Sequence, residues 1–257
     1  MINANNIKFA YNDSSNFKLD CSEFLAEPSK LTCIIGGNGS GKSTLLKIFG
    51  RKITPHKGSI YIDNKNINDY DFNKISDLIG WIDPSLSTSL VEELYVLDHY
   101  ALTLYASGHK IPFFYRRLKN IQKKNEFIPN QIILKQINNL ILKKVGNLSA
   151  GQKQNLSITL ASIMSKKILL SDESTSNLDV YYSQQFFETM KAIATENSST
   201  IIIVTHDILL ASEFSDALYF IDNGKVQKID INNICIDERI NNCKIKIFAS
   251  NDKTYCI

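Results

Sequence analysis

The sequence contains little of what marks secreted, metal-scaffolded or membrane-spanning proteins. Five cysteines lie scattered through 257 residues without a C-x-x-C pair, which disfavours a disulfide framework or a zinc site and suits a reducing cytosol. No run of 18 apolar residues occurs, and the start, Met1 to Asn6, has neither the basic flank nor the apolar core of an export signal. We therefore expect a cytoplasmic chain without a membrane span, which would serve a membrane only through a partner.

A strong net charge, internal repeats and long linkers are also missing. The 29 basic and 26 acidic side chains leave a formal charge of only +3, too small to favour nucleic acid as a main partner. We find no repeat and no Gly/Ser-rich or Pro-rich linker. With 44% hydrophobic and 21% charged residues, the composition is that of a globular protein, and the length suits one large domain or two small ones.

The chain does contain a glycine-rich turn between an apolar strand and an apolar helix. Gly36, Gly41, Lys42 and Ser43 match the phosphate-binding pattern G-x-x-x-x-G-K-[ST]. Glycines let the backbone curl so that several N–H groups and the positive end of the following helix face one hollow. A chance glycine turn that caps an ordinary helix is the alternative, but an accidental full match has a probability on the order of one per cent. We predict that the chain binds a nucleoside triphosphate.

The residues of this pattern have distinct expected roles. Lys42 would reach the β- and γ-phosphates, and the Ser43 hydroxyl would ligate Mg²⁺. Tyr11, at the end of the first predicted strand, is either an amphipathic aromatic at a strand edge or a platform on which an adenine ring stacks. The expected nucleotide-binding residues of this segment are Tyr11, Gly36, Asn38, Gly39, Ser40, Gly41, Lys42, Ser43 and Thr44.

Short apolar strands alternate with segments of helical spacing along the rest of the chain. The polar segment 64–77 is expected to be a surface excursion, and Ser149 is a suitable N-cap for a long helix. This alternation indicates an α/β fold with a parallel sheet wrapped by helices. The other predicted strands are 2–9, 17–25, 59–63, 78–82, 167–173, 200–207, 217–221, 226–229 and 244–248, and the other predicted helices are 45–49, 90–104, 131–143, 181–194 and 208–214.

Two of the apolar strands end in polar side chains. Asp172 and Glu173 follow one strand, and His206 follows another. Because the carboxyl ends of parallel strands gather at the ligand crevice, these residues should meet the phosphate loop there. Asp172 would hold Mg²⁺, Glu173 would orient a water and take its proton, and His206 would reach the γ-phosphate or Glu173. The alternatives are a pair of acids that favours a helix dipole and a structural histidine.

Five motifs stand in the order found in ATP-binding cassette (ABC) transporters, and from Ile2 to Ile229 the chain resembles their nucleotide-binding subunit. The segment LSAGQ at 148–152 resembles the signature L-S-G-G-Q, with Ala150 in place of the first glycine. The segment DESTSNLD at 172–179 resembles D-E-P-T-S-A-L-D, with Ser174 in place of proline. The second segment contains both the acidic strand end and the D-loop, and the phosphate loop and the switch histidine complete the five motifs.

The resemblance implies an ATPase that works as a dimer. Two nucleotide-binding subunits, alike or unlike, would stack head to tail, with each ATP between one phosphate loop and Ser149, Gly151 and Gln152 of the other subunit. A helix start without a lysine can hold a phosphate in this way, although an ordinary Ser-capped helix has the same local structure. Tyr11 would stack on adenine, and Asp179 would be the D-loop aspartate. Further partners would be a transmembrane permease and, in some systems, a substrate-binding protein, with the chain peripheral on the inner face of the cell membrane.

The resemblance also implies a division into domains. Residues 1–230 would form the ABC ATPase domain, a P-loop NTPase with a mostly parallel sheet, an N-terminal antiparallel β subdomain and a helical subdomain inserted at about 86–147. Residues 231–257 would form a short C-terminal extension. Within the insert, the basic run 116–124 is either a solvated helix face or a surface toward a membrane or a partner.

One departure from the family concerns the glutamine that ligates Mg²⁺ and relays to the membrane subunit. No glutamine occurs before Gln122, and the aligned position is Ile82 or Pro84. Asp83 or a water would have to supply the missing oxygen. The departure leaves open how fast the chain hydrolyses ATP and how hydrolysis is coupled to transport.

The sequence therefore predicts an ATPase that uses ATP and Mg²⁺ and drives solute movement through a separate membrane protein. A soluble ABC ATPase outside transport, for example of the iron–sulfur assembly type, is the alternative. A nucleotide kinase would need an acceptor-binding lid with arginines, and Glu173 and His206 argue against it. The transported substance, the direction of transport and the choice between a homodimer and a heterodimer do not follow from the sequence.

Overall fold

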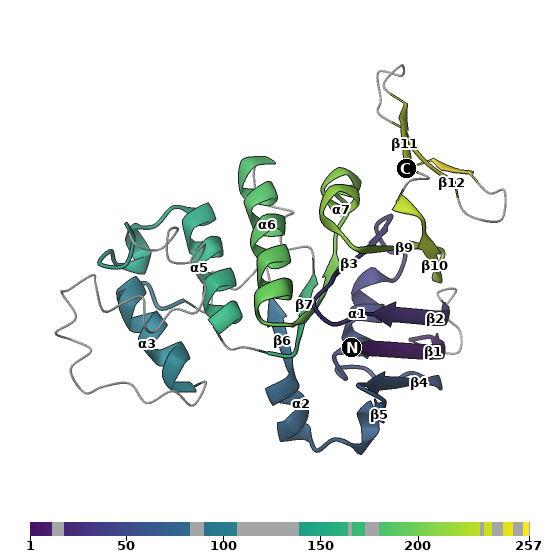
Figure 1. Ribbon diagram of the computed structural model, residues 1–257, viewed down its shortest axis with the longest axis horizontal. Helices are drawn as coiled ribbons and strands as arrows, with labels where there is room; N and C mark the ends of the chain where they lie inside the picture. Colours follow the sequence, from purple (N-terminus) through teal and green to yellow (C-terminus); the bar gives the residue numbers. More distant parts are fainter. Residues whose placement is uncertain are drawn as a thin grey trace.

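The computed structural model describes residues 1–11, 18–82, 90–106, 139–163, 166–172, 180–231, 234–237, 244–248 and 254–256. A ten-stranded sheet runs through this part of the chain in the order β5-β4-β1-β2-β10-β9-β3-β8-β7-β6 (Figure 1). Its strands are β1 (Ile2–Phe9), β2 (Leu19–Ala26), β3 (Leu31–Gly36), β4 (Lys57–Ile62), β5 (Lys65–Asn66), β6 (Ile79–Ile82), β7 (Ile168–Asp172), β8 (Thr200–Val204), β9 (Ala217–Asp222) and β10 (Lys225–Ile229).

The two halves of this sheet differ in strand direction. β3 runs parallel to both β8 and β9, and β7 runs parallel to both β8 and β6. β1 is antiparallel to β2 and β4, while β10 pairs antiparallel with β9 and parallel with β2. All residues of β3 and β8 are buried, as expected for parallel strands covered on both faces. The prediction of an α/β fold with a mostly parallel sheet and an antiparallel N-terminal part is confirmed.

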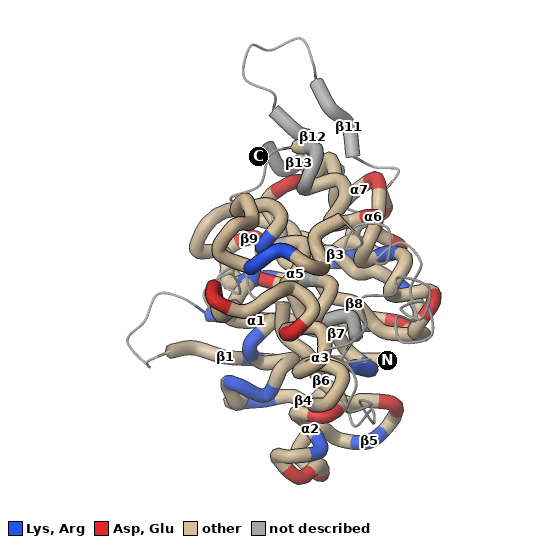
Figure 2. The backbone as a smooth tube through the Cα atoms, turned by 90° about the vertical axis from the view of Figure 1, so that its left-hand side faces the viewer, with Lys and Arg blue, Asp and Glu red and all other residues tan. Residues whose placement is uncertain are grey.

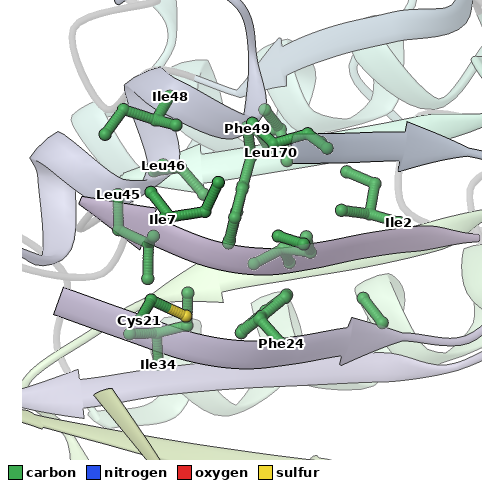
Figure 3. Close-up of a cluster of buried hydrophobic side chains, with 14 of the residues drawn as sticks. Ile2, Ile7, Cys21, Phe24, Ile34, Leu45, Leu46, Ile48, Phe49 and Leu170 are labelled. Atoms are coloured by element: carbon green, nitrogen blue, oxygen red, sulfur yellow. The ribbon is translucent and has the colours of Figure 1, made fainter. Parts of the chain in front are cut away.

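Helices cover both faces of the parallel half. On one face, α1 (Lys42–Phe49) packs Leu45 and Phe49 into a cluster that includes Ile34 of β3 and Leu170 of β7 (Figure 3). On the other face, α6 (Val180–Glu196) and α7 (Ile208–Phe214) pack into a cluster that includes Cys33 of β3. Adjacent residues of β3 thus face opposite layers. Buried contacts therefore fix both the strand that precedes the phosphate loop and the helix that follows it.

Three aromatic rings tie the antiparallel half of the sheet to α1. The Phe24 ring of β2 lies 4.5 Å from the ring of Phe49 in α1 and 4.3 Å from that of Tyr219 in β9, measured between centroids. The Tyr219 hydroxyl accepts a hydrogen bond from the Leu25 N–H at 3.0 Å and donates to the Leu25 carbonyl at 3.2 Å. Burial raises the pKa of Tyr219, so the phenol is neutral over the physiological range.

A third hydrophobic cluster lies away from the sheet, between α3 (Val96–Ala106) and α5 (Ala150–Ile163). A bridge between Tyr95 and Lys144 holds the approach to α3 against the approach to α5. In Figure 1 α5 lies beside α6 and α3 lies farther out beyond α5, away from β1 and β2. The buried members of the cluster are Leu90, Val96, Tyr100, Leu104, Ile141, Val145, Leu148, Leu156 and Leu160. A separate core of this kind supports the predicted helical insert, although α5 contributes to it beyond the predicted boundary at 147.

The predictions are less accurate in the connecting segments. The expected excursion 64–77 contains β5, a 3₁₀ turn (Ile67–Asp69) and α2 (Phe72–Leu78), because Ile67 and Ile75 are buried and anchor the segment. The helix expected at 90–104 begins only at Val96, since the chain before it pairs with 143–146. Of the helix expected at 131–143, residues 131–138 lie outside the described residues, and 139–142 form turns. The basic run 116–124 also lies outside them.

The end of the chain forms a second, smaller sheet. Its three antiparallel strands are β11 (Ile234–Asp237), β12 (Lys244–Phe248) and β13 (Thr254–Cys256), and the predicted strand 244–248 is confirmed. In Figure 2 basic and acidic residues are interspersed over the described elements, which spreads the small net charge over the molecule. Within the ranges that the structure describes, no helix combines the length and apolar character needed to cross a membrane.

Candidate nucleotide-binding site

The phosphate loop lies at the carboxyl edge of the sheet, between the end of β3 and the start of α1. A Cβ atom at Gly36 would stand 2.3 Å from the carbonyl oxygen of Ile221 in β9, so only glycine allows this approach. Gly39 and Gly41 have φ angles of +74° and +112°, which favour glycine, and Gly41 is the N-cap of α1. The loop is therefore shaped by backbone crowding on one side and by left-handed turns on the other.

The turn between β9 and β10 is hydrogen-bonded to the loop. Gly224 donates its N–H to the carbonyl oxygen of Ser40 at 3.1 Å, and Ser40 in turn donates its N–H to the carbonyl of Gly37 at 3.2 Å. Gly224 has φ +78°, and a Cβ there would stand 1.9 Å from the Lys18 carbonyl oxygen. Sequence reasoning missed this support; the run Asp222-Asn223-Gly224 between two predicted strands was the one available signal.

Lys42 places its ammonium group inside the curl of the loop. The side chain is buried, and Nζ donates to the carbonyl oxygens of Gly36 at 2.8 Å and of Gly37 at 2.9 Å. A buried ammonium is stable only where oxygen atoms surround it, which these carbonyls provide. The positive charge is thereby held at the mouth of a helix start, where an anion is favoured.

Two oxygen-bearing side chains meet beside the loop although they are far apart in sequence. The Ser43 hydroxyl in the first turn of α1 donates to Oδ1 of Asp172, at the end of β7, at 2.9 Å. Strand order brings them together, because β8 alone separates β7 from β3. Hydroxyl and carboxylate oxygens suit Mg²⁺, which keeps several water or phosphate ligands besides one or two from the protein. No cluster of three or more His, Cys, Asp or Glu side chains that could hold a metal occurs among the described residues.

A cavity of about 390 Å³ opens over the loop, and Tyr11 forms one of its walls. The tyrosine ring is about half exposed, and a hydrogen bond of 2.9 Å joins its hydroxyl to that of Thr44. The cavity thus extends from the Tyr11 ring to the backbone of the glycine-rich loop. Its lining residues are Tyr11, Asn38, Gly39, Gly41, Lys42, Ser43 and Thr44.

His206 follows β8, which lies between β3, the strand that leads into the loop, and β7, the strand that ends at Asp172. Its side chain is exposed, while the preceding Thr205 donates its N–H to the carbonyl of Ile34 in β3 at 3.1 Å. Asp207 then caps α7 by accepting the Leu210 N–H at 3.0 Å. The histidine is therefore anchored at the same sheet edge as the loop. Glu173, Asp179, Asp83 and Pro84 lie outside the described residues.

The predicted signature segment forms the start of α5. The Ser149 hydroxyl accepts the Gln152 N–H at 3.2 Å, and the Gln152 side-chain oxygen accepts the Ser149 N–H at 3.1 Å, which makes a reciprocal capping box around Gly151. Lys153 forms an ion pair with Glu92 at 2.5 Å, and this hydrogen bond lowers the pKa of Glu92. In Figure 1 α5 lies apart from α1, beyond α6. The fold thus gathers the loop, Asp172 and His206, but not the signature, at one site.

Comparisons with known proteins agree with this geometry. The family model described as "ABC transporter" matches residues 19–176, and the chain belongs to this family. It is 29% identical over 227 residues to the lipoprotein-releasing system ATP-binding protein LolD of Blochmanniella floridana, covering 86% of this chain and 90% of LolD. It is 30% identical over 234 residues to the methionine import ATP-binding protein MetN of Francisella tularensis, covering 89% of this chain but 63% of MetN.

A solved structure with the same fold is that of cbiO1 from Clostridium perfringens, part of the ABC transporter complex cbiONQ. The two chains superimpose with a TM-score of 0.72 and are 27% identical, over 88% of this chain and 86% of cbiO1. The phosphate loop and the strand order described above therefore belong to an ATP-binding cassette, and the chain is an ABC-type ATPase.

Two neighbouring glycines allow a matched test of the loop geometry. We predict that Gly36→Ala lowers the affinity for ATP by about 10- to 100-fold, because its methyl group must displace the Ile221 carbonyl. The methyl group added by Gly37→Ala would meet no atom within 4 Å, so the ATP affinity of this variant should stay within about threefold of that of the unmodified chain. Binding of a fluorescent ATP analogue measures both, and circular dichroism confirms folding. Equal affinities of the two variants would contradict the crowding argument.

Proposed function

We infer that the chain is an ATP-hydrolysing subunit that powers solute transport through a separate permease. The observation that carries this conclusion is the loop cavity with the adjoining Ser43–Asp172 pair, in a chain of the ABC transporter family. LolD and MetN are named as ATP-binding proteins of lipoprotein release and of methionine import, and cbiO1 as part of a transporter complex. Since these systems differ, they define neither the solute nor the direction of transport for this chain.

We propose that the triphosphate lies along the loop with its base on Tyr11. The backbone N–H groups from Asn38 to Thr44 would surround the phosphates, and the Lys42 ammonium would turn from the loop carbonyls toward the β- and γ-phosphates. Ser43 and Asp172 would hold Mg²⁺. When bound, this ion would neutralise charge on the β- and γ-phosphate oxygens.

Hydrolysis is proposed to depend on Glu173 and His206. The Glu173 carboxylate would orient the attacking water and take its proton, since it directly follows the metal-holding Asp172 in sequence. His206 would contact the γ-phosphate from the end of β8, the central strand of the three that end at the site. Asp179 would act as the D-loop aspartate at the subunit boundary. These roles rest on sequence position and on the anchoring of β7 and β8.

The signature is proposed to complete the pocket of a second subunit, either an identical or a related one. In the capping box the Ser149 oxygen and the Gln152 side-chain oxygen are used as acceptors. The Ser149 O–H, the Gly151 N–H and the Gln152 side-chain N–H groups can then donate to a phosphate, which offers acceptors only. Because α5 is packed on its own cluster apart from the loop, we propose that these donors serve the neighbouring subunit's ATP.

The permease is proposed to dock on the helical insert and to hold the subunit at the inner face of the membrane. Large apolar side chains are exposed there, with Val91, Tyr95 and Leu142 between 45% and 64% accessible. Such side chains commonly mark interaction sites when they gather on one surface. For an uptake system the assembly would also include a substrate-binding protein. We propose the domain division 1–230 and 231–257, with a helical insert that begins at about 86 and extends past 147 into α5, as far as Leu160 of the third cluster.

Transport can be tested by co-purification. We expect the tagged chain, isolated from membranes solubilised in mild detergent, to retain a protein with several membrane spans. A variant with Tyr95→Asp and Leu142→Asp should lose that protein, because it places charges on the apolar surface, while ATP binding stays unchanged. Recovery of the ATPase alone, or with soluble proteins only, would instead favour the alternative of an ABC ATPase outside transport.

The role of Glu173 can be tested by replacing the acid with its amide. We predict that Glu173→Gln binds ATP normally, lowers hydrolysis by at least about 100-fold and accumulates an ATP-bound dimer, because the proton acceptor is lost. Glu188→Gln, on the exposed face of α6, is the matched control and should behave as the unmodified chain. Phosphate release and size-exclusion chromatography with ATP and Mg²⁺ measure the two effects. Unchanged turnover in Glu173→Gln would overturn the assignment.

A further inference from the structure

The side chain of Tyr11 is held at two places, at its ring by Phe9 and at its hydroxyl by Thr44. The rings of Phe9 and Tyr11 pack edge to face, with centroids 5.0 Å apart and planes at 84°. His56 stacks on Phe9 in turn, at 5.3 Å and 23°. The Tyr11 hydroxyl is bonded to Thr44 at 2.9 Å. The four residues form a continuous chain of contacts from the His56 loop to the first turn of α1.

These contacts come from different parts of the fold. Phe9 ends β1 and is 9% exposed, and Thr44 lies in α1 and is 7% exposed, so both are anchored in the interior. His56 precedes β4 and is fixed by its own N–H, which donates to the carbonyl of Lys8 at 2.9 Å. Tyr11 therefore bridges the antiparallel half of the sheet and the helix of the phosphate loop. The residue remains 55% exposed and lines the cavity rather than filling it.

We propose that Phe9, His56 and the Tyr11 hydroxyl are positioning groups that fix the base platform at a set place relative to the phosphate loop. A ring held before binding loses little freedom when a base stacks on it, so the contacts raise affinity without touching the nucleotide. The hydrogen bond to Thr44 is the main link, since it ties the platform directly to the helix whose N–H groups receive the phosphates. This inference rests on the proposed contact between Tyr11 and the base.

Removing only the Tyr11 hydroxyl tests the hydrogen bond to Thr44 separately from the stacking ring. Tyr11→Phe keeps the stacking ring and should weaken ATP binding by about 2- to 10-fold, as expected for one lost hydrogen bond. The KM for ATP should rise while kcat stays unchanged, because the bound state and the transition state lose the same contact. Binding of inorganic tripolyphosphate, which has no base, should not change. In a Thr44→Val background the Tyr11→Phe effect should disappear, since the bond is already absent.

The His56 contact is tested through Phe9. His56→Ala should weaken ATP binding by about 2- to 5-fold, because the Phe9 ring loses the surface that holds it. His56→Phe keeps a stacked ring and should restore affinity, which a role for the imidazole itself would not allow. For Tyr11→Phe the matched control is Tyr105→Phe, which removes a hydroxyl at the exposed end of α3 and should not change ATP binding. Thermal unfolding checks that every variant is folded.

Failure of this inference can be told apart from failure of the proposed base contact. If Tyr11→Ala binds ATP as well as the unmodified chain, Tyr11 is not the platform, and the proposed contact is wrong. If Tyr11→Ala is weakened by tenfold or more but Tyr11→Phe binds as tightly as the unmodified chain, the ring matters and the link to Thr44 does not. Tighter binding by Tyr11→Phe, or an unchanged effect of it in the Thr44→Val background, would also overturn the positioning role.

Discussion

The close approach of two backbones at the end of β3 is the constraint on which the site depends. The Ile221 carbonyl of β9 occupies the place where a side chain at position 36 would begin, so glycine alone lets β3 pass into the loop while it stays paired with β9. On its other side β3 pairs with β8, and β8 with β7. This order brings Ser43 to Asp172 and places the end of β8, which precedes His206, between the ends of β3 and β7. The arrangement of strands, more than any local motif, makes the Ser43–Asp172 pair.

The polar side chains around the loop form hydrogen bonds within the protein. Lys42 donates to the loop carbonyls, Ser43 donates to Asp172, and Tyr11 is bonded to Thr44. Such contacts satisfy buried polar groups that would otherwise be costly. Under the proposed function, the phosphates and Mg²⁺ would replace the first two sets of bonds, whereas the third would be kept. The affinity for ATP would then depend on the difference between the bonds that ATP forms and the Lys42 and Ser43 bonds that it replaces. The Tyr11–Thr44 bond would contribute to the affinity by holding the ring in place before ATP binds.

Local patterns were sufficient to predict the loop, the strands that carry Asp172 and His206, and Ser149 as the cap of α5. Each depends on neighbours within a few residues, so the sequence records it directly. The crowding of Gly36 against Ile221 joins residues 185 positions apart, and no local pattern reveals such a pair. Most residues of segment 64–77 are exposed, as expected of a surface excursion, but its short strand, 3₁₀ turn and helix were not predicted. Its polar residues gave no sign of them, because the burial of Ile67 and Ile75 depends on the rest of the fold.

We propose that one subunit holds an incomplete pocket, because the loop and the signature belong to separate hydrophobic cores. The most direct test mixes two defective chains, Lys42→Ala and Ser149→Arg, with Mg²⁺ and an ATP analogue that cannot be hydrolysed. A mixed dimer would contain one intact pocket, formed by the loop of the second chain and the signature of the first. The account predicts by analytical ultracentrifugation that the mixture dimerises and that neither variant does so alone. A mixture that stays monomeric although the unmodified chain dimerises under the same conditions, or a Ser149→Arg chain that dimerises by itself, would contradict it.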